Sequence, residues 1–379
     1  MKINSLEVYN AHSKLRINQI NFDDFTLLVG ASGVGKTQIL RSLVKLRTIA
    51  SGKSISGFQW TIEFEIEGRI YKWDGAFETQ DSYDEMSLSV PFIINESEKP
   101  EARIVRELVT VDGETLINRN GDDIIYKDNK TVKLSLTESV IHLLREEDDI
   151  SIIHRSLSKI ILVDPNEGVA FYPSKDKDFN EDGVYSIKDV RETTFSINAK
   201  LYLCQQKQPE YFNSIVESYK GIFPFVEDVK IEKIENDAIP KIFARHFILR
   251  VKERGIDSWI PHSSMSSGMI KTFMQIAHIH LSPRGTVFLI DEFENGFGVN
   301  CINDITDILI HQGGEVQFII TSHHPYIINN IPLDNWKIIS RKAGIVDNYT
   351  ANDFNLHESN HEAFTKLINL DVYVDGADK

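Results

Sequence analysis

A glycine-rich octapeptide near the N-terminus constrains the fold of this chain more than any other feature. Residues 30–37 read GASGVGKT and fit the pattern G-x-x-x-x-G-K-[ST] at every fixed position. The apolar run Phe25–Val29 precedes this segment, and an apolar stripe of helical period follows it over about 37–49. A strand, a glycine turn and a helix in this order predict a phosphate-binding loop in an α/β protein; a glycine-rich connection with a chance Lys-Thr is the alternative.

Each part of this loop has an expected task. The glycines let the backbone turn tightly, so that its N–H groups point at phosphate oxygens, and the helix adds its positive end. Lys36 is expected to reach the β- and γ-phosphates of ATP, and the Thr37 hydroxyl to bind Mg²⁺. The predicted nucleotide-binding set is Gly30, Ala31, Ser32, Gly33, Val34, Gly35, Lys36, Thr37 and Gln38.

A second motif, VFLIDE at residues 287–292, is an apolar strand that ends in two carboxylates. Asp291, at a strand end beside a phosphate loop, is placed to hold Mg²⁺ through its hydration shell. Glu292 is then placed to orient or deprotonate the attacking water. A solvated turn after a strand would explain the same acidic pair. The phosphate loop elsewhere in the chain favours the catalytic interpretation.

A serine-glycine turn, HSSMSSGMI at residues 262–270, precedes a predicted helix. Ser266 and Ser267 can cap that helix, and Gly268 permits a close approach of another backbone. Hydroxyl groups at a helix N-terminus can also bind an anion. Taken alone, the segment fits plain capping as well as it fits a second phosphate contact.

Two histidines follow a buried strand in IITSHHP, residues 319–325. A histidine at this position can donate a hydrogen bond to a γ-phosphate and so respond to its presence. A pair of loop histidines and a metal site are the alternatives. A metal site is disfavoured because no acidic or cysteine ligand stands at a suitable spacing nearby.

The order of these four motifs resembles that of the ABC-type ATPases. GASGVGKT resembles Walker A, MSSGM resembles the ABC signature, VFLIDE resembles Walker B, and TSHHP resembles the switch-histidine segment. The resemblance implies that Ser266 and Gly268 contact the γ-phosphate of ATP bound by the opposite copy. It also implies that His323, rather than His324, is the switch histidine. The predicted catalytic residues are therefore Glu292, His323 and Lys36.

The long interval between Lys36 and Ser266 narrows the resemblance to one branch. Transporter subunits have a much shorter insertion there. The chain is similar instead to soluble ATPases related to RecF, SMC heads and the overcoming-lysogenization-defect family, and to the ATPase subunits of the Septu and PARIS anti-phage systems. By the same analogy, Asn295 and Gly296 fall in a segment that crosses the dimer interface. Gly298 and Ser267 depart from common family residues without removing a group that has an assigned role.

The predicted fold is an α/β ABC-type ATPase head with a mixed sheet, an antiparallel β subdomain and an inserted helical region. The strict alternation at Thr61–Glu67 and the Asp112-Gly113 turn indicate the antiparallel strands. Helices are expected over 138–160, 209–219, 268–281 and 299–311, and residues 165–198 are expected to be rich in loops. The predicted parts are a P-loop lobe (1–57), the β subdomain (58–136), a helical and loop insertion (137–245), a lobe with the signature, Walker B and switch histidine (246–345), and a C-terminal extension (346–379).

Composition limits the cellular setting and the partners. The 379 residues include two cysteines, no apolar run of transmembrane length and no basic-then-apolar start, so we expect a cytoplasmic protein without a membrane partner. The formal net charge of −15 opposes sequence-independent adhesion to DNA, which requires a basic face. Binding of nucleic acid to a local basic patch stays open.

The sequence therefore predicts an ATPase that uses Mg²⁺ and ATP to join two copies of itself head to tail, or to form a larger oligomer. The stretch after Pro325 is too short for a nuclease domain of the TOPRIM type. Asp371, Asp375 and Asp378 are expected to be solvated there. A separate effector protein such as a nuclease or toxin, in anti-phage defence, is the preferred partner. The alternative is a RecF-like repair ATPase that binds DNA directly; a transporter ATPase or a P-loop kinase is disfavoured.

Overall fold

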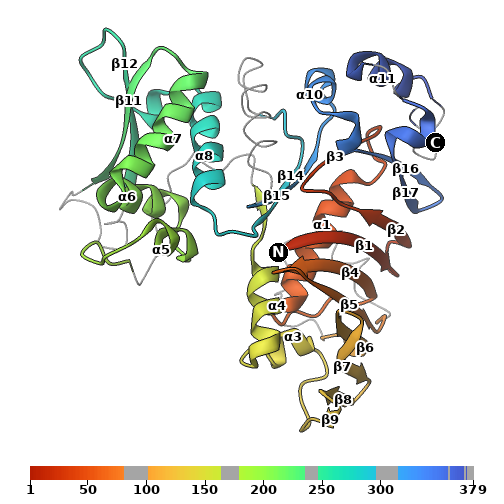
Figure 1. The fold of residues 1–379 in the computed structure, drawn as a ribbon. Coiled ribbons are helices and arrows are strands. Elements are labelled where there is room, and N and C mark those ends of the chain that lie inside the picture. The colour runs from red at the N-terminus through yellow and green to blue at the C-terminus, as the bar shows by residue number, and fades with distance from the viewer. Residues whose placement is uncertain are drawn as a thin grey trace, which may run out of the picture. The chain divides into compact units, whose positions relative to one another are not determined.

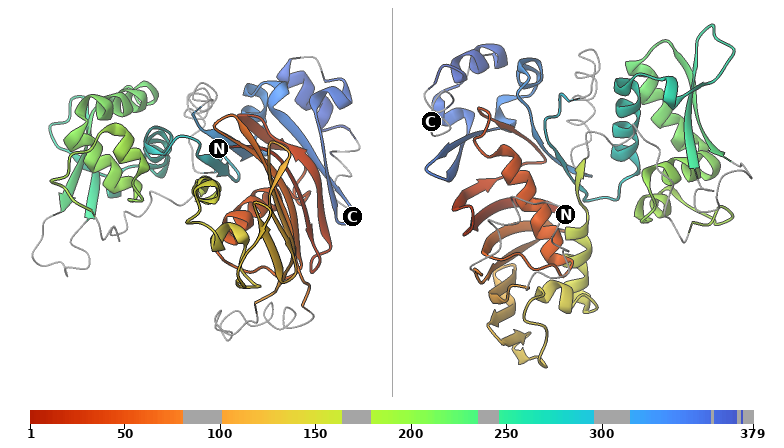
Figure 2. Two further views of the ribbon diagram at one scale, coloured as in Figure 1. Left: turned by 60° about the horizontal axis from the view of Figure 1, so that its bottom comes forward. Right: turned by 180° about the vertical axis from the view of Figure 1, so that it is seen from behind.

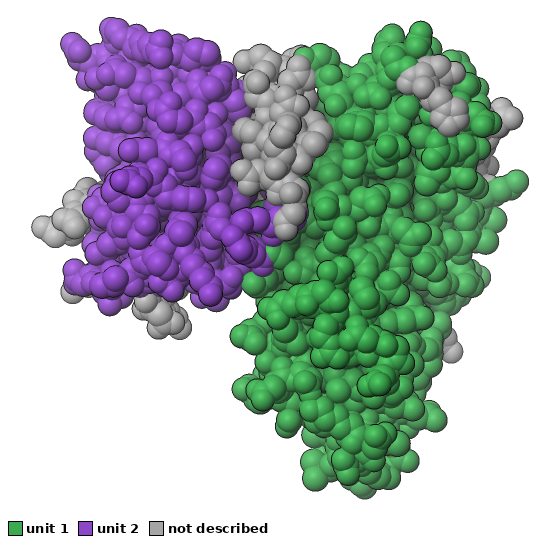
Figure 3. Space-filling view, in the orientation of Figure 1, with its two compact units in different colours: residues 1–162, 285–291, 317–379 green, residues 163–284, 292–316 purple. Residues whose placement is uncertain are grey.

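The computed structural model describes residues 1–80, 101–163, 179–234, 246–295, 315–356, 359–370 and 373. Within it the chain divides into two compact units (Figure 3). Unit 1 comprises Met1–Leu162, Gly285–Asp291 and Gln317–Lys379, and unit 2 comprises Val163–Arg284 and Glu292–Val316. The predicted helix at 299–311 lies outside the described residues, as do Gly296, Gly298, Asp371, Asp375 and Asp378.

One 14-stranded sheet forms the framework of unit 1 (Figure 1). Its strand order is β10-β14-β15-β3-β16-β17-β2-β1-β4-β5-β6-β7-β8-β9. The strands are β1 (Lys2–Asn10), β2 (Leu15–Asn21), β3 (Phe25–Val29), β4 (Phe58–Ile66), β5 (Arg69–Phe77), β6 (Ile104–Val111), β7 (Glu114–Asn120), β8 (Asp123–Tyr126), β9 (Asn129–Lys130), β10 (Ile160–Val163), β14 (Val287–Ile290), β15 (Gln317–Thr321), β16 (Trp336–Lys342) and β17 (Ile345–Tyr349).

The sheet is mixed, which confirms the predicted fold class. Strands β14, β15, β3 and β16 run parallel to one another, whereas β2, β1 and β4 to β9 form an antiparallel series. Because β1 pairs with β4 over nearly its whole length, the sheet continues without a break past residue 57. The antiparallel strands are thus an extension of the sheet that carries β3 and the glycine-rich loop, and not a separate layer.

Helix α1 (Lys36–Ala50) lies against the inner face of this curved sheet (Figure 2). Its fully buried side chains Leu40, Leu43 and Leu46 belong to one apolar cluster with residues of β1, β2 and β4. Strand β4 buries every second side chain, as its alternating sequence predicts. The cluster fixes α1, and with it the loop that precedes α1, against the strands.

The rest of unit 1 differs in part from the sequence-based prediction. Residues 138–160, expected to be helical, contain two helices, α3 (Val140–Leu143) and α4 (Asp148–Ser158), which are separated by a turn and followed by β10. After β15 come α10 (Pro325–Asn330), the 3₁₀ turns η4 (Leu333–Asn335) and η5 (Ala351–Phe354), and α11 (Asn360–Leu367). None of the helices within the described ranges combines the length and the hydropathy of a membrane-spanning segment.

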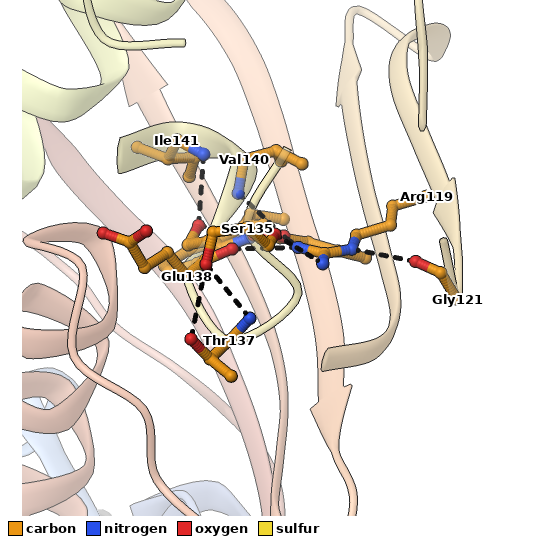
Figure 4. Close-up of polar contacts among 10 residues, drawn as sticks. Arg119, Gly121, Ser135, Thr137, Glu138, Val140 and Ile141 are labelled. Carbon is orange, nitrogen blue, oxygen red and sulfur yellow. Dashed lines mark hydrogen bonds and ion pairs between the residues drawn. The ribbon is translucent and has the colours of Figure 1, made fainter. Parts of the chain in front are cut away.

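A buried ion pair joins strands β6 and β7 in the antiparallel part of the sheet. Glu107 and Arg119 have fully buried side chains, and Arg119 Nη1 lies 3.9 Å from Glu107 Oε2. The guanidinium also donates to three backbone carbonyl groups (Figure 4), those of Gly121 at 3.2 Å, Ser135 at 2.9 Å and Glu138 at 2.9 Å. Arg119 therefore holds the segment between β9 and α3 onto the sheet.

The Glu107 carboxylate receives its own set of hydrogen bonds. Ser139 Oγ donates at 2.5 Å, the Val140 backbone N–H at 2.9 Å and Trp73 Nε1 at 2.9 Å. Burial raises the pKa of the Glu107 carboxyl above its ordinary value, although these hydrogen bonds and the charge of Arg119 act in the opposite direction. The result is a carboxylate built into the first turn of α3.

Unit 2 combines helices with a small antiparallel sheet. The helices are α5 (Ile187–Glu192), α6 (Ile197–Lys207), α7 (Pro209–Ile222) and α8 (Ser267–Leu281); the strands are β11 (Val226–Ile234), β12 (His246–Glu253) and β13 (Ile260–Pro261), with η3 (His262–Ser264) after them. Helices α7 and α8 match the predicted ones. Residues 165–198 were expected to be loop-rich, but their described part contains α5 and the start of α6.

Helix α8 forms much of the core of unit 2. Ile270, Phe273, Ala277 and Leu281 are buried along one face, as their spacing predicts. The ring of Phe273 meets that of Tyr219 from α7 edge to face, with centroids 5.2 Å apart. This packing holds the N-terminus of α8, where the serine-glycine turn lies, on a rigid element.

Candidate nucleotide-binding site

Three neighbouring parallel strands of unit 1 place the predicted site residues at one edge of the sheet. Strand β15 pairs with β14 on one side and with β3 on the other. The carboxyl ends of parallel strands lie at the same edge, so the segments after them meet. The phosphate loop follows β3, Asp291 follows β14, and His323 follows β15.

The glycines of the loop are needed because neighbouring strands come very close. A Cβ atom on Gly30 would lie 2.4 Å from the carbonyl oxygen of Ile339 in β16. Gly35 has φ of 104°, and a Cβ there would lie 2.9 Å from Val346 Cγ2 in β17. At Gly33, with φ of 86°, only the backbone conformation requires glycine, since nothing lies within 4 Å.

Lys36 is folded into its own loop. Its side chain is almost fully buried, and Nζ donates to the carbonyl oxygens of Gly30 at 2.7 Å and Ala31 at 2.8 Å. The N-cap of α1 is Gly35, which has no side chain to cap the helix, and the first turn of α1 carries no acidic residue. No protein anion of α1 thus competes with a phosphate for the positive end of the helix.

A hydroxyl group of the loop meets the carboxylate that follows β14. Thr37 Oγ1 donates to Asp291 Oδ1 at 3.1 Å. The same oxygen accepts a hydrogen bond from Thr321 Oγ1, at the end of β15, at 2.7 Å. A hydroxyl and a carboxylate are the hard oxygen ligands that suit Mg²⁺, so the pair Thr37 and Asp291 fits the predicted metal.

Thr321 is a polar contact that the sequence-based reasoning missed. It is the first residue of the TSHHP segment, in which only the histidines had been given a chemical role. Strand pairing places Ile320 beside Ile290, so that Thr321 and Asp291 are the next residues of two adjacent strands. Knowledge of the strand order would have identified the contact.

The two histidines after β15 differ in their surroundings. His324 is the N-cap of α10: its Nδ1 accepts from the backbone N–H of Tyr326 at 3.3 Å, and its own N–H donates to Ser322 Oγ at 3.0 Å. His323 lies one residue closer to β15 and is half-buried. Both histidines are half-buried, and the choice of His323 as the histidine that would face a phosphate stays a prediction.

Glu292 directly follows Asp291 and has an unusual backbone conformation. Its φ is 49°, in the left-handed region that residues other than glycine seldom occupy. Asn295 stabilises the turn, because its side-chain amide donates to Glu292 Oε2 and its N–H donates to the Glu292 carbonyl at 2.8 Å. Strained residues of this kind, at a cost of roughly 1–3 kcal/mol, cluster at active sites.

Ser266 and Gly268 lie in unit 2, at the start of α8. Ser266 is the N-cap, and its hydroxyl oxygen accepts from the Met269 N–H at 3.3 Å. The capping interpretation is therefore correct for this residue. Ser266 is nonetheless exposed, and its hydroxyl proton can still be donated to an anion.

Fold and motifs together define an ATPase domain of the ABC type. A family model described as "AAA domain, putative AbiEii toxin, Type IV TA system" matches residues 25–329. The chain belongs to this family of AAA domains. No curated protein matches the sequence.

Solved structures of SMC heads are similar to the whole chain. The SMC head bound to the C-winged helix domain of ScpA has a TM-score of 0.50 and 13% identity, and the match covers 94% of this chain and 99% of that one. The head from Pyrococcus furiosus, bound to the C-terminal domain of ScpA, has a TM-score of 0.49 and 13% identity, with 97% and 99% covered. The head from Thermotoga maritima has 0.43 and 11%, with 92% and 99% covered. The first of these supports the SMC-head fold.

Proposed function

We propose that the protein hydrolyses ATP with Mg²⁺ and acts as a nucleotide-driven dimerisation switch. The observation that carries this proposal is the hydrogen bond of 3.1 Å between Thr37 Oγ1 and Asp291 Oδ1. It brings the loop hydroxyl to the carboxylate of another strand at the edge where the phosphate loop begins. Membership of a family of AAA domains supports nucleotide binding at that edge.

The residues divide the reaction between them. Lys36 exchanges its two loop carbonyl groups for the β- and γ-phosphate oxygens of ATP. Thr37 and Asp291 would hold Mg²⁺, and the metal would supply positive charge to neutralise these phosphates. Glu292 accepts a proton from a water molecule whose oxygen attacks the γ-phosphorus, while the bond to the β,γ-bridging oxygen breaks and ADP leaves. His323 donates a hydrogen bond to the transferred phosphoryl group.

A second copy of the chain completes the site in this proposal. Ser266 and Gly268 of one copy contact the γ-phosphate bound by the other, so that ATP joins the copies and hydrolysis releases them. Support comes from the exposure of Ser266 at the N-terminus of the 15-residue helix α8, which favours an anion. Each copy alone then carries only half of the groups that contact the γ-phosphate.

We further propose that this switch controls a separate effector protein, such as a nuclease or toxin, in cytoplasmic anti-phage defence. The family description names a toxin of a type IV toxin–antitoxin system, and the SMC head with a TM-score of 0.50 is bound to a domain of another protein, ScpA. A net charge of −15 favours a protein partner over direct DNA binding. ATPase activity that DNA stimulates, and that salt strongly weakens, would favour the RecF-like alternative.

Two substitutions test the switch. Glu292→Gln should bind ATP, hydrolyse it at least about 100-fold more slowly and accumulate as a dimer or larger assembly, because the proton acceptor is lost while the ATP contacts remain. Adding Ser266→Arg should prevent this assembly but leave ATP binding intact. Light scattering after gel filtration, with Mg²⁺ and ATP, measures the oligomeric state of both variants. Ser214→Arg, exposed on α7, is the matched control. Glu292→Gln that stays monomeric with ATP bound would contradict the shared site.

A further inference from the structure

Thr321 ends strand β15 as a buried polar residue among apolar ones. It is 1% exposed, and Phe318, Ile319 and Ile320 before it are fully buried. Its hydroxyl donates to Asp291 Oδ1 at 2.7 Å, the shorter of the two hydrogen bonds that this oxygen receives. A valine of the same shape would suit the apolar strand equally well, so packing alone does not explain the hydroxyl.

The two threonine contacts to Asp291 come from different parts of the fold. Thr37 lies in the first turn of α1, next to Lys36, and its hydroxyl is the group expected to turn toward Mg²⁺. Thr321 lies on a strand paired directly with β14, so its position relative to Asp291 is fixed by the sheet. When Thr37 turns to the metal, the Thr321 hydrogen bond can persist and keep the carboxylate in place.

We propose that Thr321 is a positioning residue for the Mg²⁺ site: it orients the Asp291 carboxylate before the metal arrives. The inference rests on the proposed function. Partners that orient metal ligands in this way typically contribute 10- to 100-fold to metal affinity. Because Thr321 is two residues before His323, the same strand end also joins the metal ligand to the proposed γ-phosphate contact.

The test is Thr321→Val, which keeps the shape of the side chain and removes its hydroxyl. We expect the Mg²⁺ concentration for half-maximal ATPase activity to rise about 10- to 100-fold. Binding of a fluorescent ATP analogue in EDTA should stay within about twofold of wild type, since Lys36 and the loop are unchanged. Thr321→Ser, which retains the hydroxyl, should restore the Mg²⁺ response.

Thr26→Val is the matched control on the neighbouring strand. Thr26 is fully buried in β3 and pairs with Ile319 of β15, but its Oγ1 accepts from the N–H of Asp23 at 2.9 Å, within its own turn. Its removal should leave the Mg²⁺ response unchanged. Thermal melting of both variants measures how much each substitution affects the fold.

The outcomes separate the inference from the function beneath it. An unchanged Mg²⁺ response in Thr321→Val, an equal shift in Thr26→Val, or failure of Thr321→Ser to restore the response would overturn the positioning role while leaving the ATPase proposal intact. Wild-type protein that binds no ATP analogue, with or without Mg²⁺, would overturn the proposed function and the inference with it.

Discussion

Two helices of unit 1, α3 and α1, differ in how the protein contacts their N-terminal backbone N–H groups. At the start of α3, the Glu107 carboxylate accepts the N–H of Val140, and Arg119 balances its charge. At the start of α1, the cap is a glycine and the first turn has no acidic residue. Both are places where a backbone favours an anion. The first is capped by a side chain of the protein, whereas the N-cap Gly35 of the second provides no side-chain hydrogen bond to the helix.

These two helix starts therefore serve different purposes: one contributes to stability and the other to the proposed function. The partners of Glu107 and Arg119 are all parts of the chain, so breaking the pair should weaken the fold. Lys36 donates to two carbonyl oxygens of its own loop, which a ligand can replace. Nucleotide binding can therefore use interactions on which the core does not depend.

The largest effect on stability should come from breaking the buried pair of Glu107 and Arg119. Arg119→Met removes a buried cation, leaves Glu107 without its counter-charge and should lower the free energy of unfolding by about 3–5 kcal/mol. Urea denaturation at neutral pH measures the loss. The control is Arg106→Met on β6, whose partner Asp74 lies 2.5 Å away and whose side chain is 54% exposed; about 1 kcal/mol or less is expected. If the two variants lost equal stability, the pair would not be the structural anchor described.

A substitution in the phosphate loop should instead reduce ATP binding or turnover and leave stability nearly unchanged. Lys36→Ala should weaken ATP binding or turnover at least about 100-fold, equivalent to about 2.7 kcal/mol, with only a small loss of stability. Calorimetric titration with ATP and a steady-state phosphate assay measure this change. Lys45→Ala, on the same helix and with its charge over the ring of Phe58, should keep wild-type affinity. Unaltered ATP affinity and turnover in Lys36→Ala would refute the role of the loop.

The smallest effect concerns pH. Burial raises the pKa of Glu107 in the folded state above its value in the unfolded state. The contribution of this group to stability is therefore present below the unfolded-state pKa and is lost as the pH rises through the folded-state pKa. Arg119→Met should raise that pKa further. The stability deficit of the variant should therefore be larger at pH 8 than at pH 5, by about 1.4 kcal/mol for each added pKa unit. Urea denaturation at the two pH values checks the sign, and a deficit independent of pH would contradict it.

Much of the candidate site could be predicted because its signals are local. GASGVGKT fixed the loop and the start of α1, and the spacing of apolar residues predicted α8, β14 and β15 close to their observed bounds. The strand pairing of the three-stranded sheet of unit 2 was not predicted. In this sheet β11 pairs with β12, and the residues between them lie outside the described ranges. A periodic pattern within one strand does not indicate which strand it pairs with.

The sequence by itself determined the chemistry available to this protein, since the residue types and their order specify a phosphate loop, an acidic strand end and a histidine after a strand. Only the tertiary structure decided which of these groups touch. Thr321 reaches Asp291, and Ile339 comes so close to Gly30, because of the strand order β14-β15-β3-β16. The reason is physical: local backbone preferences act over a few residues, whereas these contacts join strands far apart in the chain through hydrogen bonds and burial.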